Sequence, residues 1–189
     1  MLFDALILQL KALAPRYNNN VAGAAEFAIG IDRNTWLPQP AAYVVIGPLE
    51  AGENESMNGL YQRLTQHFQV VVSLDNRADR RGQTAMTTVP LDMAAICPAI
   101  LNWRPDSAAD APAYQACNPY PNRAARGIRL LGGELLEYDR ARLFWAFDFA
   151  FDTIITEWDG WQQPSVPLTD IQVNAPEGSF GSFDAPISQ

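Results

Sequence analysis

The segment from Arg142 to Trp158, RLFWAFDFAFDTIITEW, constrains the fold more than any other part of the chain. Apolar and aromatic residues alternate along it with smaller or acidic ones. One set is Phe147, Phe149, Phe151, Thr153 and Ile155, and the other is Ala146, Asp148, Ala150, Asp152 and Ile154. Successive side chains of a strand point to opposite faces, so this pattern predicts a long strand with an aromatic face in the core. Such a strand needs partner strands and a second layer to cover that face.

Three other segments are predicted to supply the partner strands. Residues 61–75 alternate in the same way, with Leu64, Phe68, Val70, Val72 and Leu74 on one side. Residues 41–49 are β-branched and aromatic and lie between Pro40 and Pro48, so we expect them to pair with 61–75 as an antiparallel hairpin through a polar connection, 50–59. Residues 127–139 form a strand interrupted at Gly132 and Gly133, where a tight hairpin is one option.

Two main helices are predicted to cover the sheet. Residues 1–14 place apolar side chains at helical spacing, and Pro15 follows where the helix should end. The second helix, about 88–103, begins with Pro90 in its first turn, and Pro98 should kink or shorten it at a cost of roughly 3 kcal/mol. It is apolar nearly all round, which predicts burial under the sheet or at a subunit contact. Residues 23–29 can form a short helix before a loop.

These elements predict an α+β fold, with an antiparallel β-sheet packed against two main α-helices and an extended C-terminal arm. We expect residues 1–157 to form the domain and residues 158–189 the arm, which is rich in Pro, Gly and Ser. The arm retains apolar side chains, which we predict to bind a partner by strand addition: Trp161, Leu168, Ile171, Val173, Phe180 and Phe183. The partner would be a neighbouring subunit or another protein of the same assembly, and the alternative is a mobile tail that only solubilises.

The distribution of charge restricts the partners. The formal net charge is −8, from 21 acidic and 13 basic residues, and residues 143–189 hold no Lys or Arg. Binding to phosphate needs a basic surface, so the balance argues against a protein whose main work is to grip nucleic acid. The acidic end is either a solvating tail or a surface that repels anions. The apolar N-terminal stretch contains Asp4 and Gln9 and has no basic leader, so we predict a soluble intracellular protein without a membrane partner.

No motif for catalysis, cofactor binding or metal binding is found in the sequence, and none of these sites is predicted. His67, the single histidine, lies mid-strand on the polar side. Asp148 and Asp152 lie about 13 Å apart along their strand, beyond the roughly 5–9.5 Å of glycosidase carboxylate pairs, so we expect a solvated or channel-facing strand face. Cys97 and Cys117 are predicted to be free, buried thiols.

The charged segment NRADRRG, residues 76–82, is the best candidate for a contact between subunits. Its opposite charges are interleaved at a strand-to-helix corner, where ion pairs can set the register between neighbours. The predicted interface residues are Arg77, Asp79, Arg80 and Arg81. A solvated loop and an anion-binding site are the two alternatives.

Four segments in this order resemble the tail terminator proteins of long-tailed bacteriophages, including the lambda-like ones: PAAYVVIGPLEAGEN, QRLTQHFQVVVSLDNRADRRG, ILNWRP and LLGGELLEYDRARLFWAFDFAFD. The resemblance covers roughly residues 1–156, while Pro98 and the arm lie outside the family's common pattern. It implies a hexameric ring that caps the tail tube, ends its polymerisation and forms the docking surface for the head and neck.

The resemblance also implies the partners and the location. These are the tail tube protein, a head-tail connector or neck protein, and genomic DNA that passes through the lumen without specific binding. The protein would be a non-enzymatic virion component without a cofactor, located in the tail or neck and assembled in the host cytoplasm. The rival interpretations are another neck, head-tail joining or tail-completion protein, a small acidic enzyme that uses Asp148 and Asp152, and a monomeric binding module.

Overall fold

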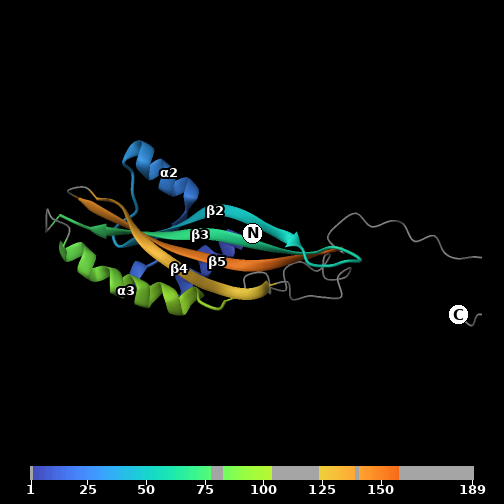
Figure 1. The fold of residues 1–189 in the computed structure, drawn as a ribbon. Helices are drawn as coiled ribbons and strands as arrows, with labels where there is room; N and C mark the ends of the chain where they lie inside the picture. Colours follow the sequence, from blue (N-terminus) through green and yellow to red (C-terminus); the bar gives the residue numbers. More distant parts are fainter. Residues whose placement is uncertain (1, 78–82, 104–123, 139–140, 158–189) are drawn as a thin grey trace, which may run out of the picture.

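The computed structural model describes residues 2–77, 83–103, 124–138 and 141–157, which fold as an α+β structure (Figure 1). In chain order, the elements are α1 (Leu2–Leu13), a 3₁₀ turn (Pro15–Tyr17), β1 (Val21–Gly23), α2 (Ala24–Arg33), β2 (Ala41–Asn54), β3 (Tyr61–Asp75), α3 (Gln83–Ile100), β4 (Ala124–Tyr138) and β5 (Arg142–Thr156). The predicted fold class is confirmed.

The five strands form one sheet in the order β1-β2-β3-β5-β4. Only β1 and β2 are parallel; the other neighbours are antiparallel. The predicted hairpin of β2 and β3 is present, and β3 lies beside β5 with Phe68 opposite Phe149 and Val70 opposite Phe147. Both strand pairings predicted from alternation are therefore confirmed.

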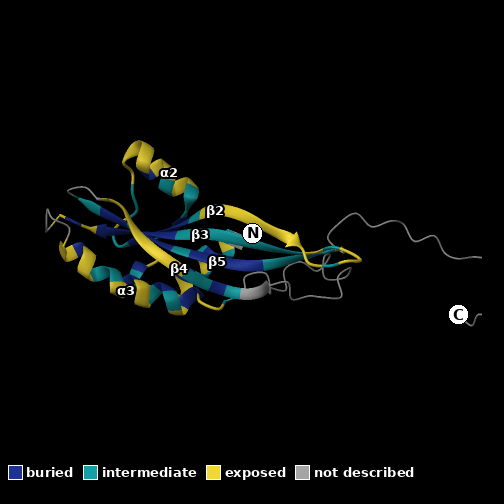
Figure 2. Cartoon of the chain, in the orientation of Figure 1, coloured by how far each residue is buried: buried dark blue, intermediate teal, exposed yellow. Residues whose placement is uncertain are grey.

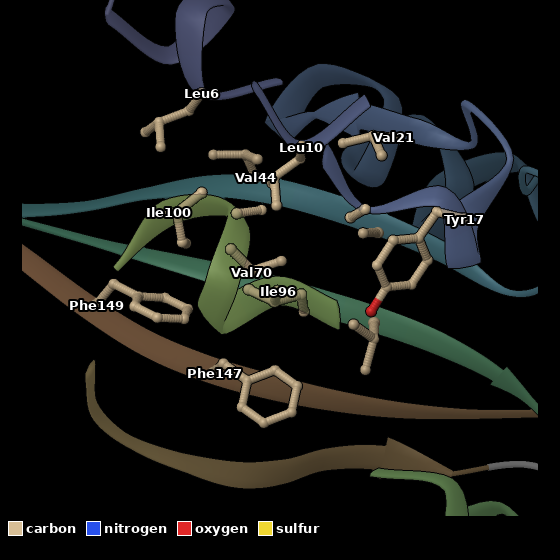
Figure 3. Packing of buried hydrophobic residues seen from close by; sticks show 14 of the residues in the cluster. Leu6, Leu10, Tyr17, Val21, Val44, Val70, Ile96, Ile100, Phe147 and Phe149 are labelled. Atoms are coloured by element: carbon tan, nitrogen blue, oxygen red, sulfur yellow. The ribbon is translucent and has the colours of Figure 1, made fainter. Parts of the chain in front are cut away.

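The main core lies between one face of the sheet and helices α1 and α3 (Figure 3). It contains the aromatic face of β5, the apolar side chains of β3, and Leu6, Leu10, Ile96 and Ile100 from the two helices. Phe149 is fully buried and stacks on Phe68 with ring centroids 5.4 Å apart. The predicted orientation of the phenylalanines of β5 is confirmed.

A second core on the opposite face of the sheet was not predicted. Helix α2 covers this face at one end of the sheet, where Phe27 and Trp36 pack on Tyr43 and Phe144. Gly30 allows this packing, since a Cβ atom there would lie 2.4 Å from the Trp36 ring. The helix was expected only as a short element, because its ten residues contain few large apolar side chains.

Helix α3 differs from its prediction in length and in burial. It begins at Gln83, so Pro90 lies inside it and not in the first turn, and both Pro90 and Pro98 are exposed. Because proline has no amide proton, the carbonyls four residues earlier, those of Met86 and Ala94, lack their usual helical hydrogen bond. Both residues are exposed, so water can bind these carbonyls. Only one face of α3 is buried in the single chain, so the sheet does not cover it on most sides, and the alternative of burial at a subunit contact stays a prediction.

Two strands are longer than the sequence patterns predicted. β4 runs through Gly132 and Gly133 without a hairpin, since both residues keep partners in β5. β2 continues to Asn54, so residues 50–54 belong to the strand and not to the connection. Its register shifts between Ile46 and Leu49, which places Pro48 at an irregularity on the edge of the sheet, where a missing amide is tolerated.

Gly127 permits the close contact between β4 and the end of α3. Asn102 donates its backbone amide to Ile128, and a Cβ atom on Gly127 would lie 2.5 Å from the Asn102 carbonyl oxygen. Gly127→Ala must displace backbone, so we expect it to lower the free energy of unfolding by about 1–3 kcal/mol in urea denaturation. Gly132→Ala is the control, since nothing lies within 4 Å of its Cβ position. Equal stability of the two variants would contradict this packing.

Candidate functional site

The sheet projects beyond the helices at one end (Figure 1). On the sheet face that carries α2, a row of polar residues runs from the part that this helix leaves uncovered towards the projecting end. We call this row the polar strand face. Its members come from β3, β5 and β4: Arg63, Thr65, His67, Gln69, Asp148, Asp152 and Arg129. Glu50 of β2 and Glu55, which follows β2, pair with two of them. Ion pairs and hydrogen bonds link its side chains across β3, β5 and β4, which makes it the candidate site.

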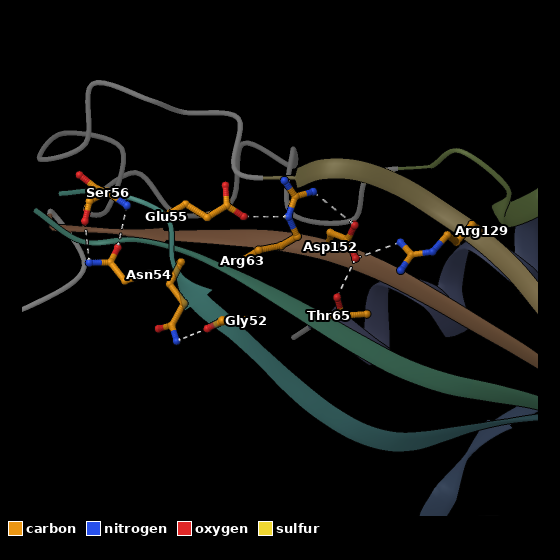
Figure 4. Close-up of polar contacts among 9 residues, drawn as sticks. Gly52, Asn54, Glu55, Ser56, Arg63, Thr65, Arg129 and Asp152 are labelled. Atoms are coloured by element: carbon orange, nitrogen blue, oxygen red, sulfur yellow. Dashed lines mark hydrogen bonds and ion pairs between the residues drawn. The ribbon is translucent and has the colours of Figure 1, made fainter.

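Asp152 is the centre of the polar strand face (Figure 4). Its side chain is 3% exposed and accepts hydrogen bonds from Thr65 Oγ1 at 3.0 Å and Arg129 Nη1 at 2.9 Å. Arg63 Nη1 lies 3.8 Å from the other carboxylate oxygen and also pairs with Glu55. Burial alone would raise the pKa of Asp152, but the hydrogen bonds from Arg129 and Thr65 and the two positive charges hold it below its ordinary value.

The depressed pKa of Asp152 predicts how stability depends on pH. Because the folded pKa is lower than the unfolded one, the ionised carboxylate stabilises the fold above about pH 4, and this contribution is lost as the pH falls through the folded pKa. Asp152→Asn should therefore have a lower melting temperature than the wild type at pH 6, and the difference should shrink towards pH 3. A difference that is constant over this range would contradict the assignment.

The other acidic residue of interest, Asp148, has a separate partner. Gln69 Nε2 donates to Asp148 Oδ1 at 2.8 Å, while His67 Nε2 lies 3.5 Å from a carboxylate oxygen of Glu50. The expectation of a solvated strand face is wrong for Asp152, which β3 and β4 enclose, because two arginines on flanking strands compensate its charge. Asp148 and Asp152 are thus bound to neighbouring strands and do not form a carboxylate pair.

A buried ion pair on the other face was missed by sequence reasoning. Asp92 of α3 is fully buried and accepts hydrogen bonds from Arg16 Nε at 2.7 Å and Nη2 at 3.0 Å and from Tyr17 Oη at 2.9 Å. The hydrogen bond to Asp92 raises the pKa of Arg16, and burial, together with Asp92, raises the pKa of Tyr17 far above its ordinary value. The only sequence signal was one acidic residue in an apolar helix.

The residues predicted at subunit contacts are only partly described. Arg77 is exposed and pairs with Asp75, the last residue of β3, at 2.6 Å, and its hydrogen bonds lower the pKa of Asp75 to about 2. Asp79, Arg80 and Arg81 lie outside the described residues, as does the whole arm, including Trp161, Leu168, Ile171, Val173, Phe180 and Phe183. Of the predicted interface residues, the structure thus places only Arg77, and the contact between subunits stays a prediction.

Thiols, metal-binding clusters and membrane-spanning helices are the other kinds of site to consider. Cys97 is a half-buried free thiol whose pKa is raised by burial, and Cys117 lies outside the described residues. Within the described ranges no group of three or more His, Cys, Asp or Glu side chains could hold a metal ion. None of the helices described is both long and apolar enough to cross a bilayer.

The contacts of the polar strand face and of Asp92 link neighbouring strands and join α3 to the segment after α1. The model of the phage tail terminator protein family matches residues 2–160, and the chain belongs to this family. It is a structural component of the phage tail and of the virion.

A solved structure shows a distant similarity to this chain. A chain in the virion of a native gene transfer agent particle is 15% identical, with a TM-score of 0.41. The similarity covers 80% of this chain and 92% of that chain. No curated protein matches the sequence.

Proposed function

We propose that this protein caps the tail tube, ends its polymerisation and forms the docking surface for the head and neck. The match of the terminator family to residues 2–160 carries the proposal. Its partners are the tail tube protein and a head-tail connector or neck protein, and it assembles in the host cytoplasm. The protein acts as a hexameric ring in which residues 1–157 form the domain and residues 158–189 a partner-binding arm.

The outer face of α3 supports an oligomer. Apolar side chains are exposed along and just after this helix in the isolated chain: Met86 36%, Leu91 57%, Met93 45% and Leu101 40%. Large apolar side chains exposed along one helix are compatible with a protein interface. We infer that a neighbouring subunit covers it in the ring.

The charge of the chain supports a lumen through which DNA passes without specific binding. The net charge is −8, and the polar strand face has four carboxylates but only two guanidinium groups, both of them in ion pairs. Such a surface does not condense phosphate, because that requires free cationic side chains.

The test is to add the purified protein to tail tubes that are still elongating. We expect tube growth to stop, and a ring of six copies to be seen at one tube end by electron microscopy. A protein that leaves tube length unchanged and binds only the portal complex would instead be a head-completion protein, and the proposal would be wrong.

The charged loop provides a mutational test of the ring. We predict that Arg80→Glu combined with Arg81→Glu leaves the monomer folded, because the substitutions lie in a charged corner, but weakens ring formation by reversing interface charges. Circular dichroism checks the fold and ring counts on tail tubes check assembly. Arg33→Glu is the control, since its side chain is 75% exposed on α2. Normal assembly of the double variant would show that the loop is only a solvated corner.

A further inference from the structure

The two outer edges of the sheet differ in their ability to accept another strand. β1 covers only the start of β2, and the rest of the β2 edge contains Pro48, which has no amide to donate to a further strand. β4 pairs with β5 on one side only, and within the described part of the chain no strand lies on its other side. The open edge of the sheet is therefore that of β4.

The middle of β4 has only part of the usual protection of an edge strand. Residues 131–137 are exposed (Figure 2) and contain neither proline nor lysine, but they include Glu134 and Glu137, and the register against β5 shifts twice in this stretch. Leu131 is 50% exposed, and Leu135 and Leu136 are each 41% exposed. Exposed apolar side chains on an edge strand favour pairing with another extended segment, and the two carboxylates restrict which segment fits.

A cleft with aromatic and polar lining lies directly beside this edge, on the α2 face. It has a volume of about 500 Å³ and is lined by Phe27, Gly30, Ile31, Asn34, Trp36, Leu136, Glu137 and Phe144. A strand paired with β4 would present every second side chain to this face. The edge supplies backbone hydrogen bonds and the cleft supplies a pocket for side chains, which together are the two requirements of recognition by strand addition.

The sequence offers one segment that matches this surface in length and pattern. Between Pro167 and Pro176, residues 168–175 read LTDIQVNA and contain no proline or glycine. Thr169, Ile171 and Val173 are β-branched and alternate, which favours a strand with one apolar face. Its eight residues equal the length of β4 from Leu131 to its end at Tyr138.

The linker before this segment is too short for that register within one chain. Leu131 lies between the two β4 residues that pair with Phe149 and Asp148 of β5. To place Leu168 beside Leu131 of its own copy, the chain would have to run back from Glu157 by about 26 Å along the sheet and by about 10 Å across it. Reversing the chain direction takes about four residues of the linker 158–167. The remaining linker residues span at most about 20 Å, which is less than the distance required. β5 ends at the projecting end of the sheet, so the linker points away from the β4 edge of its own copy (Figure 1). The edge of a neighbouring copy is not bound to this direction.

We propose that residues 168–175 of one copy add as a sixth strand to the β4 edge of a neighbouring copy, with Ile171 and Val173 in the cleft beside α2. The proposal rests on the proposed ring and names the contact that closes it. Each copy has one donor segment and one acceptor edge, so the contact is heterologous and can run around a closed ring.

The experiment measures amide exchange of residues 131–137 in the full-length protein assembled on tail tubes. We expect exchange at least about tenfold slower than in the dilute monomer, because strand pairing protects amides. Replacing both Ile171 and Gln172 by proline should abolish this protection, since amides of successive strand residues point to opposite sides and one of the two must face β4. The control Ser165→Pro in the linker should keep the protection. Fast exchange in the assembled wild-type protein would overturn the proposal.

A second measurement identifies which copy donates the strand. Isotopically heavy protein with Leu136→Cys is mixed with light protein carrying Val173→Cys, both in a background with Cys97→Ala and Cys117→Ala. Heavy–light disulfides support the proposal. The alternative is that the segment pairs with the β4 edge of its own chain. To test it, a single chain that carries both new cysteines is oxidised at high dilution. Rapid formation of a disulfide within that chain, together with slow amide exchange of residues 131–137 in the dilute monomer, would overturn the proposal. Ring formation is observed separately by electron microscopy. Rings that form without heavy–light disulfides would refute only the contact between residues 168–175 and β4. Absence of rings would refute the proposed function.

Discussion

Replacing Phe149 by alanine is expected to lower the free energy of unfolding by about 3–5 kcal/mol, since the ring is fully buried and its removal leaves a cavity in the main core. The ring stacks on Phe68 in the centre of the sheet, where side chains from β3, α1 and α3 meet. Rigid strands on both sides of β5 prevent the site from collapsing. Urea denaturation at pH 7 gives the change directly.

The control for Phe149→Ala is Leu8→Ala, because Leu8 is 65% exposed on α1. We expect this surface change to stay within about 0.5 kcal/mol of the wild type. A loss below about 1 kcal/mol for Phe149→Ala would mean that the aromatic face of β5 does not form the core.

Replacing Asp92 by alanine should cost about 3 kcal/mol, the lower end of the range for breaking a buried ion pair. Arg16 is 27% exposed and can turn towards water, but the hydroxyl of Tyr17 loses its acceptor inside the core. Equilibrium unfolding in urea measures the loss. Asp32→Ala is the control, since the Asp32 side chain is 83% exposed.

A triple variant separates the charge of this cluster from its packing. Replacing Arg16 by Met, Tyr17 by Phe and Asp92 by Leu removes all polar partners together, and well-packed apolar substitutes for buried pairs are often neutral. We expect it to recover most of the stability that Asp92→Ala loses. A triple variant as unstable as Asp92→Ala would show that the carboxylate is needed for more than pairing.

The sequence correctly predicted the elements whose residue pattern is determined by the burial of one apolar face. β3 and β5 were correct because strict alternation with large apolar side chains is compatible with little besides a strand, and α1 was correct because its stripe ends at Pro15. The family resemblance pointed to the same region, which the match to residues 2–160 bears out.

The remaining errors have identifiable physical causes. β4 continues through Gly132 and Gly133 because the ladder with β5 outweighs the local preference of glycine for turns, and α3 tolerates two prolines because both face solvent. Asp152 was expected to be solvated because its partners, Arg63 and Arg129, are distant in sequence. Asp92 was missed for the same reason, since Arg16 lies 76 positions away.

The projecting end of the sheet gives the molecule the mechanics of a cantilever. Helices α1, α3 and α2 clamp the sheet from both faces at one end, whereas residues 49–54, 61–66 and 152–156 extend beyond the clamp (Figure 1). A load on the free tip produces its largest bending moment at the clamp, where Phe68 and Phe149 stack. The hydrogen bonds and ion pairs of Asp152 link β5 to β3 and β4 at the projecting end. The three strands should therefore bend together under load and not separately.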